Sequence, residues 1–258
     1  MIRAVLFDLS GVLYIGGQLI PGAVEAIERL YEAKIPLRFI TNTTRRSRIM
    51  VYNDLRDIGF HIKLESIYTP VQAVINYLKK NNLVPHLLVH PNIQEDFKDC
   101  KEQSPNAVVI GDAAEYFNYN VLNEAFRLLM KDAPLIAMGY NRYFKEPAGM
   151  SLDLGPFVTA LEYAAQIKAT IIGKPSANFF HQVYSDFGVD KAHIIMFGDD
   201  YASDTLGAIE AGLQGGLVKT GKYRKGDENS LASSGAVIVS NITEAADWCL
   251  SNYQPKPQ

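Results

Sequence analysis

The 258-residue sequence has an ordinary globular composition, 48% hydrophobic and 21% charged, which suits one large domain or two smaller ones. Its net charge of −3 argues against a nucleic-acid or anionic-membrane partner and favours a small molecule. Two cysteines, Cys100 and Cys249, are too few for a disulfide framework and match no metal-binding spacing. No run reaches the roughly 18 apolar residues of a membrane span, and no signal peptide is recognised, so we expect a soluble, cytoplasmic protein.

The first part of the chain predicts strands and helices in alternation. Short apolar runs rich in β-forming residues predict strands at residues 3–9, 35–44 and 65–70. Apolar residues at helical spacing predict helices at residues 21–34, 45–60 and 71–82. The short links between these segments are typical of right-handed βαβ units on a parallel sheet.

The last part of the chain repeats this alternation. Strands are predicted at residues 169–175, 193–200, 214–221 and 236–241, and helices at residues 176–188, 204–212 and 242–253. Residues 84–169 predict a complete α/β module of their own. We therefore expect an α/β protein with a Rossmann-like, doubly wound parallel-sheet core, residues 1–83 and 170–258, and an inserted α/β domain, residues 84–169.

Polar residues follow the predicted strands of the core. In a parallel α/β sheet, ligands bind beyond the carboxyl ends of the strands, so these residues are candidates for a common site. In chain order they are Asp8 and Ser10; Thr41, Asn42 and Thr43; Gly173, Lys174 and Pro175; and Gly198, Asp199, Asp200 and Asp204.

If these ends converge, the residues suit phosphoryl transfer. Asp8 and Asp199 could hold Mg²⁺, which prefers oxygen ligands, and Thr41 and Lys174 could donate to phosphate oxygens. Asp8 could then attack phosphorus in line. Taken singly, each motif has an ordinary explanation, such as a turn, a helix cap or loop chemistry. The order and placement of the four together favour the site.

The four segments resemble, in order, the motifs of the haloacid dehalogenase superfamily of phosphatases: "DLSGV", "TN", the lysine of "GKP", and "GDDYASD". The resemblance covers almost the whole chain, and the insertion resembles the large α/β (C2-type) cap of the nitrophenyl-phosphatase-like subgroup. Longer strings resemble the inorganic pyrophosphate phosphatase branch of that family. They include "FITNTT", "PNAVVIGDA", "GPFVTALEYA" and "VKTGKYR".

The resemblance implies a role for each site residue. Asp8 would be the nucleophile that forms an aspartyl-phosphate, with Lys174 and Thr41 as its catalytic partners. Mg²⁺ would be bound by Asp8, the backbone carbonyl of Ser10, and Asp199. Asp204 would support the metal ligands without binding the metal itself, and the role of Asp200 stays open. The substrate would be contacted by Asp8, Leu9, Ser10, Thr41, Asn42 and Lys174.

Ser10 departs from the family pattern, in which an aspartate two residues after the nucleophile protonates the leaving group and activates water. A hydroxyl cannot do this near neutral pH, and general acid–base help is worth about 10²–10⁴-fold in rate. The serine therefore predicts selectivity for substrates whose leaving groups depart easily: pyrophosphate, phosphoramidates, and aryl or acyl phosphates. The alternative is a phosphate-binding protein with negligible catalysis.

Other functional classes of protein fit this sequence less well. A receiver-type signalling domain would be shorter and lack the insertion, and no dinucleotide or P-loop glycine motif is present. Substrate choice is expected in the cap, where residues 141–157 either reach toward the site or form a solvent loop. Caps of this kind often pair across a two-fold axis, so the resemblance also implies a possible homodimer.

Overall fold

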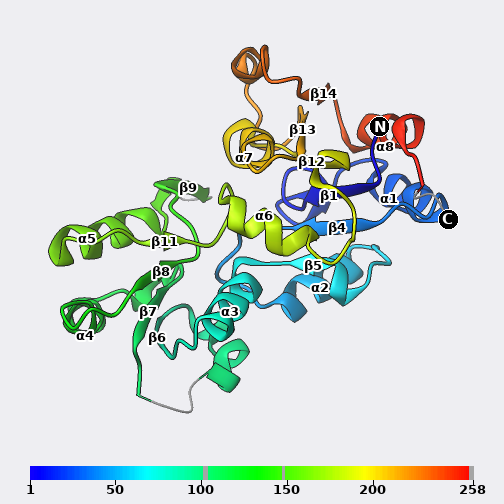
Figure 1. Ribbon diagram of the computed structural model, residues 1–258. Coiled ribbons are helices and arrows are strands. Elements are labelled where there is room, and N and C mark those ends of the chain that lie inside the picture. The colour runs from blue at the N-terminus through cyan, green and yellow to red at the C-terminus, as the bar shows by residue number, and fades with distance from the viewer. Residues whose placement is uncertain (101–103, 147–148, 256–258) are drawn as a thin grey trace. The chain divides into compact units, whose positions relative to one another are not determined.

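The computed structural model describes residues 1–100, 104–146 and 149–255 (Figure 1). Packing divides the chain into two compact units, which we call the first and the second unit. The first unit comprises Met1–Thr41, Ile49–Tyr68 and Lys174–Gln258, and the second comprises Asn42–Arg48 and Thr69–Gly173.

The second unit contains more of the chain than the expected inserted domain, residues 84–169. Helix α3 (Pro70–Lys80) packs against the helical segment η2 (Pro91–Cys100), so it groups with the second unit and not with the core. The segment Asn42–Arg48 also belongs there, because its side chains bond to residues of the inserted module. The chain passes back to the first unit between Gly173 and Lys174.

A parallel sheet of six strands forms the first unit. Its strand order is β14-β13-β12-β1-β4-β5. The strands are β1 (Ala4–Asp8), β4 (Leu37–Ile40), β5 (Ile67–Tyr68), β12 (Ile194–Gly198), β13 (Gln214–Val218) and β14 (Val237–Val239). The chain builds the sheet outward from β1 in one direction through β4 and β5, and later in the other direction through β12. Beside β1 the strand order therefore reverses, which is where open α/β sheets bind ligands.

Helices cover this sheet. They are α1 (Ala23–Glu32), α2 (Arg48–Asp57), α6 (Ala177–Tyr184), α7 (Gly207–Glu210) and α8 (Ile242–Asn252). Shorter elements are the hairpin β2 (Tyr14–Ile15) with β3 (Gln18–Leu19), the turns η1 (Leu64–Ser66), η4 (Lys191–His193) and η6 (Asp227–Leu231), and a π-helical turn, η5 (Tyr201–Leu206). The expected doubly wound α/β fold is confirmed.

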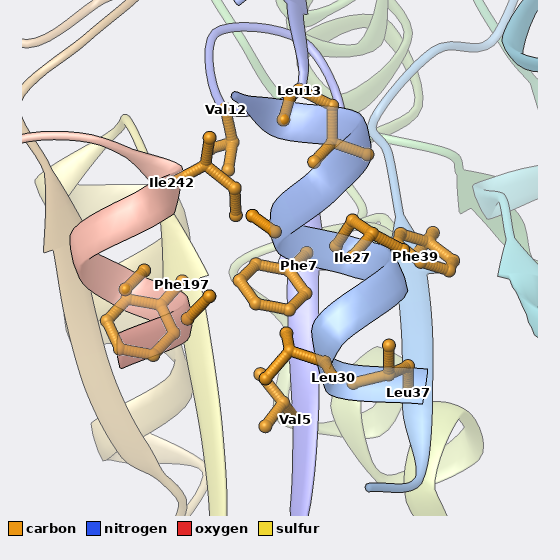
Figure 2. Close-up of a cluster of buried hydrophobic side chains, with 14 of the residues drawn as sticks. Val5, Phe7, Val12, Leu13, Ile27, Leu30, Leu37, Phe39, Phe197 and Ile242 are labelled. Carbon is orange, nitrogen blue, oxygen red and sulfur yellow. The ribbon is translucent and has the colours of Figure 1, made fainter. Parts of the chain in front are cut away.

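Three phenylalanines on neighbouring strands form the centre of the first unit's core (Figure 2). Phe7 of β1 stacks on Phe197 of β12 at 5.8 Å between ring centroids and on Phe39 of β4 at 6.5 Å. Ile27 of α1 and Ile242 of α8 pack over the same face. Burying each such side chain stabilises the fold by about 1.5–3 kcal/mol.

The opposite face of the central strands is buried as well. Side chains alternate between the faces of a strand, so Ala4 and Leu6 point away from Phe7, yet none of the three is exposed. Burial on both faces explains why "AVLF" has no polar residue until Asp8, where the strand ends.

Helix α1 forms where the sequence places Ala23, Ala26, Ile27 and Leu30 on one buried face. Gly22 precedes it with φ +78°, a conformation that favours glycine. A Cβ at Gly22 would lie 2.7 Å from the Thr243 hydroxyl oxygen, so this glycine also permits the close packing of α1 and α8.

The second unit has its own parallel sheet, in the order β11-β8-β7-β6. Its strands are β6 (Pro85–Leu88), β7 (Ala107–Ile110), β8 (Leu135–Ala137) and β11 (Thr170–Ile171), and its helices are α3, α4 (Tyr119–Leu129) and α5 (Gly155–Ala165), with a short turn η3 (Ala114–Tyr116). Residues 141–157, which the sequence predicts either to reach toward the site or to form a solvent loop, contain two antiparallel strands, β9 (Tyr143–Glu146) and β10 (Gly149–Leu152), before α5 begins.

Strand β11 corrects one sequence prediction. Residues 169–175 were expected to form a core strand leading to Lys174. Instead, Thr170 and Ile171 pair with Ile136 and Ala137 of β8, and the Ile172 N–H donates to the Ala137 carbonyl at 2.8 Å. The strand therefore completes the second unit's sheet, because its hydrogen-bonding partners are there.

None of the helices in the described part of the chain combines the length and the apolar character that crossing a membrane demands.

Candidate functional site

Asp8 and Asp199 lie side by side at the carboxyl ends of paired strands. Asp8 ends β1 and Asp199 follows β12, and the two strands are hydrogen-bonded neighbours at the point where the strand order reverses. Asp204, in the π-helical turn η5, completes a cluster in which one oxygen from each carboxylate lies within 4.8 Å of the others. All three side chains are buried, at 6%, 2% and 1% exposure.

Lys174 is the cation of this cluster. Its buried ammonium group forms an ion pair and hydrogen bond with Asp8 and a second ion pair, at 2.7 Å, with Asp204 Oδ1. Burial alone would lower the pKa of Lys174, but Asp204 and Asp8 outweigh it and raise that pKa above its ordinary value. Lys174 therefore stays charged, although no strand of the first unit leads to it.

The carboxylates repel one another in this buried place. Burial raises the pKa of Asp8 to about 7, with Lys174 opposing the rise and Asp204 and Asp199 adding to it. Burial also raises the pKa of Asp199 to about 6, against the hydrogen bond from the Lys222 N–H. One ammonium does not balance three buried carboxylates. The cluster therefore suits a divalent cation bound by oxygen ligands.

Two glycines allow the loops to close around Asp199. Gly11, at φ +90°, and Gly221, at φ +58°, lie so close that a Cβ on either would overlap the Asp199 carboxylate. The Thr220 hydroxyl donates to the Gly11 carbonyl, and the Lys222 N–H donates to Asp199 Oδ2 at 2.7 Å. The loop after β13 is thus part of the site.

Sequence reasoning missed that loop. From the sequence, residues 219–222 are predicted only to end a strand and to belong to a segment that resembles the family. The available signal was "KTGK", a hydroxyl, a glycine and two lysines directly after a core strand, which is the same kind of polar strand end as the other four motifs.

Asp200 caps the turn that carries Asp204. Its Oδ1 accepts the N–H groups of Ala202 and Ser203, each at 3.0 Å, while its own N–H donates to Asp204 Oδ2 at 3.2 Å. Burial opposes ionisation of Asp200, but the hydrogen bonds and Lys222 lower its pKa. Asp200, whose role the sequence leaves open, is therefore the N-cap of this helical turn.

Leu9 and Ser10 form the turn that follows the nucleophile candidate. The Leu9 side chain is fully buried and its carbonyl accepts the Leu13 N–H at 2.9 Å. Ser10 is exposed and forms an isolated bridge with Tyr14. Ser10 therefore lies at the surface of the first unit, two residues after the buried Asp8.

Thr41 and Asn42 fall on either side of a unit boundary. Thr41 follows Ile40, the residue of β4 that pairs with Asp8, and its N–H donates to the Tyr68 carbonyl at 3.2 Å. Thr41 is buried in the first unit, whereas Asn42 belongs to the second. Of the sequence-predicted residues, the structure thus brings together Asp8, Lys174, Asp199 and Asp204 in one cluster, with Thr41 one strand away.

The segment after Asn42 is tied into the second unit. The Thr44 hydroxyl accepts the Asp112 N–H at 3.0 Å, and Arg45 Nε donates to Asp112 Oδ2 at 2.7 Å. The Arg45 guanidinium also lies over the Phe144 ring, 5.1 Å from its centroid. The basic run 45–48 thus includes a residue that fixes this segment.

Comparison with known proteins places these motifs in a family. Residues 5–102 match the model described as haloacid dehalogenase-like hydrolase, and residues 171–245 match a second model, HAD-hydrolase-like. The chain is 41% identical over 257 residues to phospholysine phosphohistidine inorganic pyrophosphate phosphatase of Danio rerio, covering 97% of this chain and 95% of the relative. It is 43% identical over 251 residues to haloacid dehalogenase-like hydrolase domain-containing protein 2 of Homo sapiens, covering 97% of both chains.

A solved structure agrees with the sequence relatives. The crystal structure of a 4-nitrophenylphosphatase from Thermotoga maritima matches with a TM-score of 0.87 and 26% identity, over 95% of this chain and 97% of that one. The family resemblance expected from the sequence motifs is therefore confirmed, as is the closer resemblance to the pyrophosphate phosphatase branch.

Proposed function

Because the chain belongs to the haloacid dehalogenase-like hydrolases and is an enzyme of their phosphatase kind, we propose that it is a Mg²⁺-dependent phosphohydrolase that uses Asp8 as a nucleophile. The proposed substrates are small molecules with activated phosphoryl bonds. The observation that carries the proposal is the buried cluster of Asp8, Asp199 and Asp204 around Lys174.

The proposed reaction has two steps. A carboxylate oxygen of Asp8 forms a bond to phosphorus, and the bond from phosphorus to the leaving group breaks, its electron pair staying with the leaving group. Water then attacks the aspartyl-phosphate, which releases orthophosphate and restores the Asp8 carboxylate. Lys174 touches Asp8 and offsets the negative charge where nucleophile and phosphate meet.

The residues present fit Mg²⁺. Asp8, Asp199 and the backbone carbonyl of Ser10 would hold the ion, because these are hard oxygen donors. Asp204 is less suited to bind the ion directly, since its Oδ1 pairs with Lys174 and its Oδ2 accepts the Asp200 N–H. When bound, Mg²⁺ would act as a Lewis acid on a phosphoryl oxygen. Thr41 would donate its hydroxyl to another phosphoryl oxygen.

Ser10 supports the choice of substrate class. Its hydroxyl cannot protonate a departing alkoxide, so alkyl phosphates would react slowly, whereas an orthophosphate, a phenolate or a protonated amine leaves without such help. The names of the Danio rerio relative, phospholysine, phosphohistidine and pyrophosphate, describe P–N and P–O–P bonds of that kind. We therefore infer that pyrophosphate and phosphoramidates are better substrates than alkyl phosphates.

The test is phosphate release from pyrophosphate, a phosphoramidate, an aryl phosphate and an alkyl phosphate, with and without Mg²⁺. Wild type is compared with Asp8→Asn, which keeps the size of the side chain and removes its nucleophilic carboxylate. Metal-dependent release that follows leaving-group pKa and disappears in the variant supports the proposal. Release no higher than that of the variant on all four compounds would favour the alternative, a phosphate-binding protein.

A further inference from the structure

The loop after β13 holds one lysine at the edge of the site by its backbone. Gly221 lies against Gly11 and Asp199, the Thr220 hydroxyl bonds to the Gly11 carbonyl, and the Lys222 N–H bonds to Asp199. These three contacts fix the Cα of Lys222 beside a proposed metal ligand without using its side chain. The fixed backbone position therefore limits the region that the Lys222 ammonium group can reach to the edge of the site.

The side chain of Lys222 is only loosely engaged. It is 68% exposed, and its Nζ lies 3.7 Å from Asp200 Oδ2. Charge-assisted hydrogen bonds between such groups are about 2.7–2.9 Å long, so this is a weak, solvent-screened pair. Asp200 already accepts two backbone N–H groups through its other oxygen, so it does not depend on Lys222. The ammonium can move to another anion at little cost.

Lys174 cannot serve a second phosphoryl group. Its side chain is 3% exposed and its ammonium pairs with both Asp8 and Asp204, so its charge is directed at the nucleophile. A substrate with two phosphoryl groups brings additional negative charge that must lie away from Asp8, on the leaving side. Lys222 offers an exposed, flexible cation in the same unit and beside Asp199.

We propose that Lys222 binds the leaving phosphoryl group of a diphosphate substrate and makes the site selective for pyrophosphate-like compounds over monophosphate esters. This inference rests on the proposed function, of which it specifies the substrate class.

The chemistry of the first step shows why the charge matters. Asp8 bonds to one phosphorus, the bridging P–O bond breaks, and its electron pair stays on the bridging oxygen of the departing orthophosphate. The negative charge of the leaving group therefore grows as the bond breaks. The Lys222 ammonium keeps its proton and donates a hydrogen bond to that group. This electrostatic stabilisation of the leaving group replaces part of the help that a general acid at position 10 would give.

The first experiment compares kcat/KM for pyrophosphate with kcat/KM for 4-nitrophenyl phosphate in Lys222→Met, which keeps the apolar stem and removes the charge. A charged hydrogen bond to substrate corresponds to roughly tenfold to a hundredfold, so we expect the pyrophosphate to nitrophenyl phosphate ratio to fall by that factor. Lys222→Arg, which keeps the charge, should restore most of the ratio. Arg224→Met and Lys225→Met remove exposed charges from the same loop and should leave the ratio unchanged.

The second experiment measures binding without turnover. Methylenebisphosphonate cannot be cleaved at its bridge, and its dissociation constant, measured by titration calorimetry, should rise in Lys222→Met about as much as the ratio falls, while that of orthophosphate stays nearly constant. An equal loss on both substrates, or an unchanged ratio in Lys222→Met, overturns the inference. If wild type releases phosphate from no compound, the proposed function fails instead, and the methylenebisphosphonate measurement still decides the role of Lys222.

Discussion

Lys174 and Asp8 form a buried ion pair across 166 residues of sequence, and the same ammonium also pairs with Asp204. The lysine stabilises two buried carboxylates. This arrangement makes Lys174 a structural residue as well as a proposed catalytic one, and the two contributions can be measured separately.

Replacing Lys174 by Met should destabilise the protein at pH 7, because Asp8 and Asp204 lose their shared cation. Breaking a buried ion pair in this way costs about 3–5 kcal/mol of the free energy of unfolding. Urea unfolding of metal-free protein measures the loss. The double variant Lys174→Met/Asp204→Asn should recover part of it, since one buried charge is removed, and equal stability of wild type and Lys174→Met would contradict the arrangement.

The stability of the metal-free protein should decrease as pH rises from about 4 to about 7. Burial raises the pKa of Asp8 to about 7 and that of Asp199 to about 6, from the ordinary aspartate pKa of 3.8, so the folded state holds more protons than the unfolded state in this range. Stability is therefore greatest below pH 4 as far as these groups are concerned, and is lost as they ionise.

Mg²⁺ should oppose that loss, because it favours the ionised carboxylates, and its stabilising effect should be larger at pH 8 than at pH 5. Thermal unfolding with Mg²⁺ or with a chelator, at both pH values, measures this. Asp199→Asn should flatten the metal-free pH dependence. A metal effect that is the same at both pH values would show that Mg²⁺ does not bind at these groups.

Ser10→Asp should raise turnover of alkyl phosphates by about 10²–10⁴-fold, the usual worth of a general acid, while pyrophosphate turnover changes little. The exposed position of Ser10 leaves room for the longer side chain. The check is kcat for both substrates, with Ser10→Asn as a control of similar size that cannot transfer a proton. If Ser10→Asp and Ser10→Asn behave alike, leaving-group chemistry is not what the serine controls.

Gly11→Ala should weaken Mg²⁺ binding strongly, because its Cβ would overlap the Asp199 carboxylate and displace it. Gly16→Ala is the matched control, since Gly16 also has a positive φ, +56°, but nothing lies within 4 Å of the added methyl group. Both variants place an alanine in the left-handed region, which costs roughly 1–2 kcal/mol, so the difference between them reports mainly the contact with Asp199. Titration of each variant with Mg²⁺, followed by thermal shift, measures that difference, and equal affinities would remove Asp199 from the metal site.

Sequence reasoning located the chemistry of the site better than its supporting structure. Asp8 and Asp199 were predictable because an apolar run that stops at a carboxylate marks a buried strand's end. Lys174 was identified by its motif, yet the strand before it, β11, belongs to the other sheet. A strand of two residues carries no information about its partner, because pairing is decided by the surrounding fold.

The same limit explains the other differences. Helix α3 was predicted correctly as a helix by its buried apolar face, but its grouping depends on contacts with η2 that no local pattern encodes. The loop of Thr220, Gly221 and Lys222 reaches Asp199 through the backbone N–H of Lys222, a group that every sequence has, and reaches the Gly11 carbonyl through the Thr220 hydroxyl. The sequence signals such an approach only by the polar residues and the glycine of "KTGK" directly after the strand.

The strand order has a consequence for synthesis. When β1 and β4 have been made, β1 can pair on one edge, but its other edge waits for β12, where Ala4 pairs with Ile194. Most of the chain must leave the ribosome before that edge is covered and before Asp8 meets Lys174 and Asp199. Such non-local contacts form slowly. A truncated or stalled chain therefore exposes an unpaired, wholly apolar strand that ends in an uncompensated carboxylate, a species prone to aggregate and unable to act on phosphate.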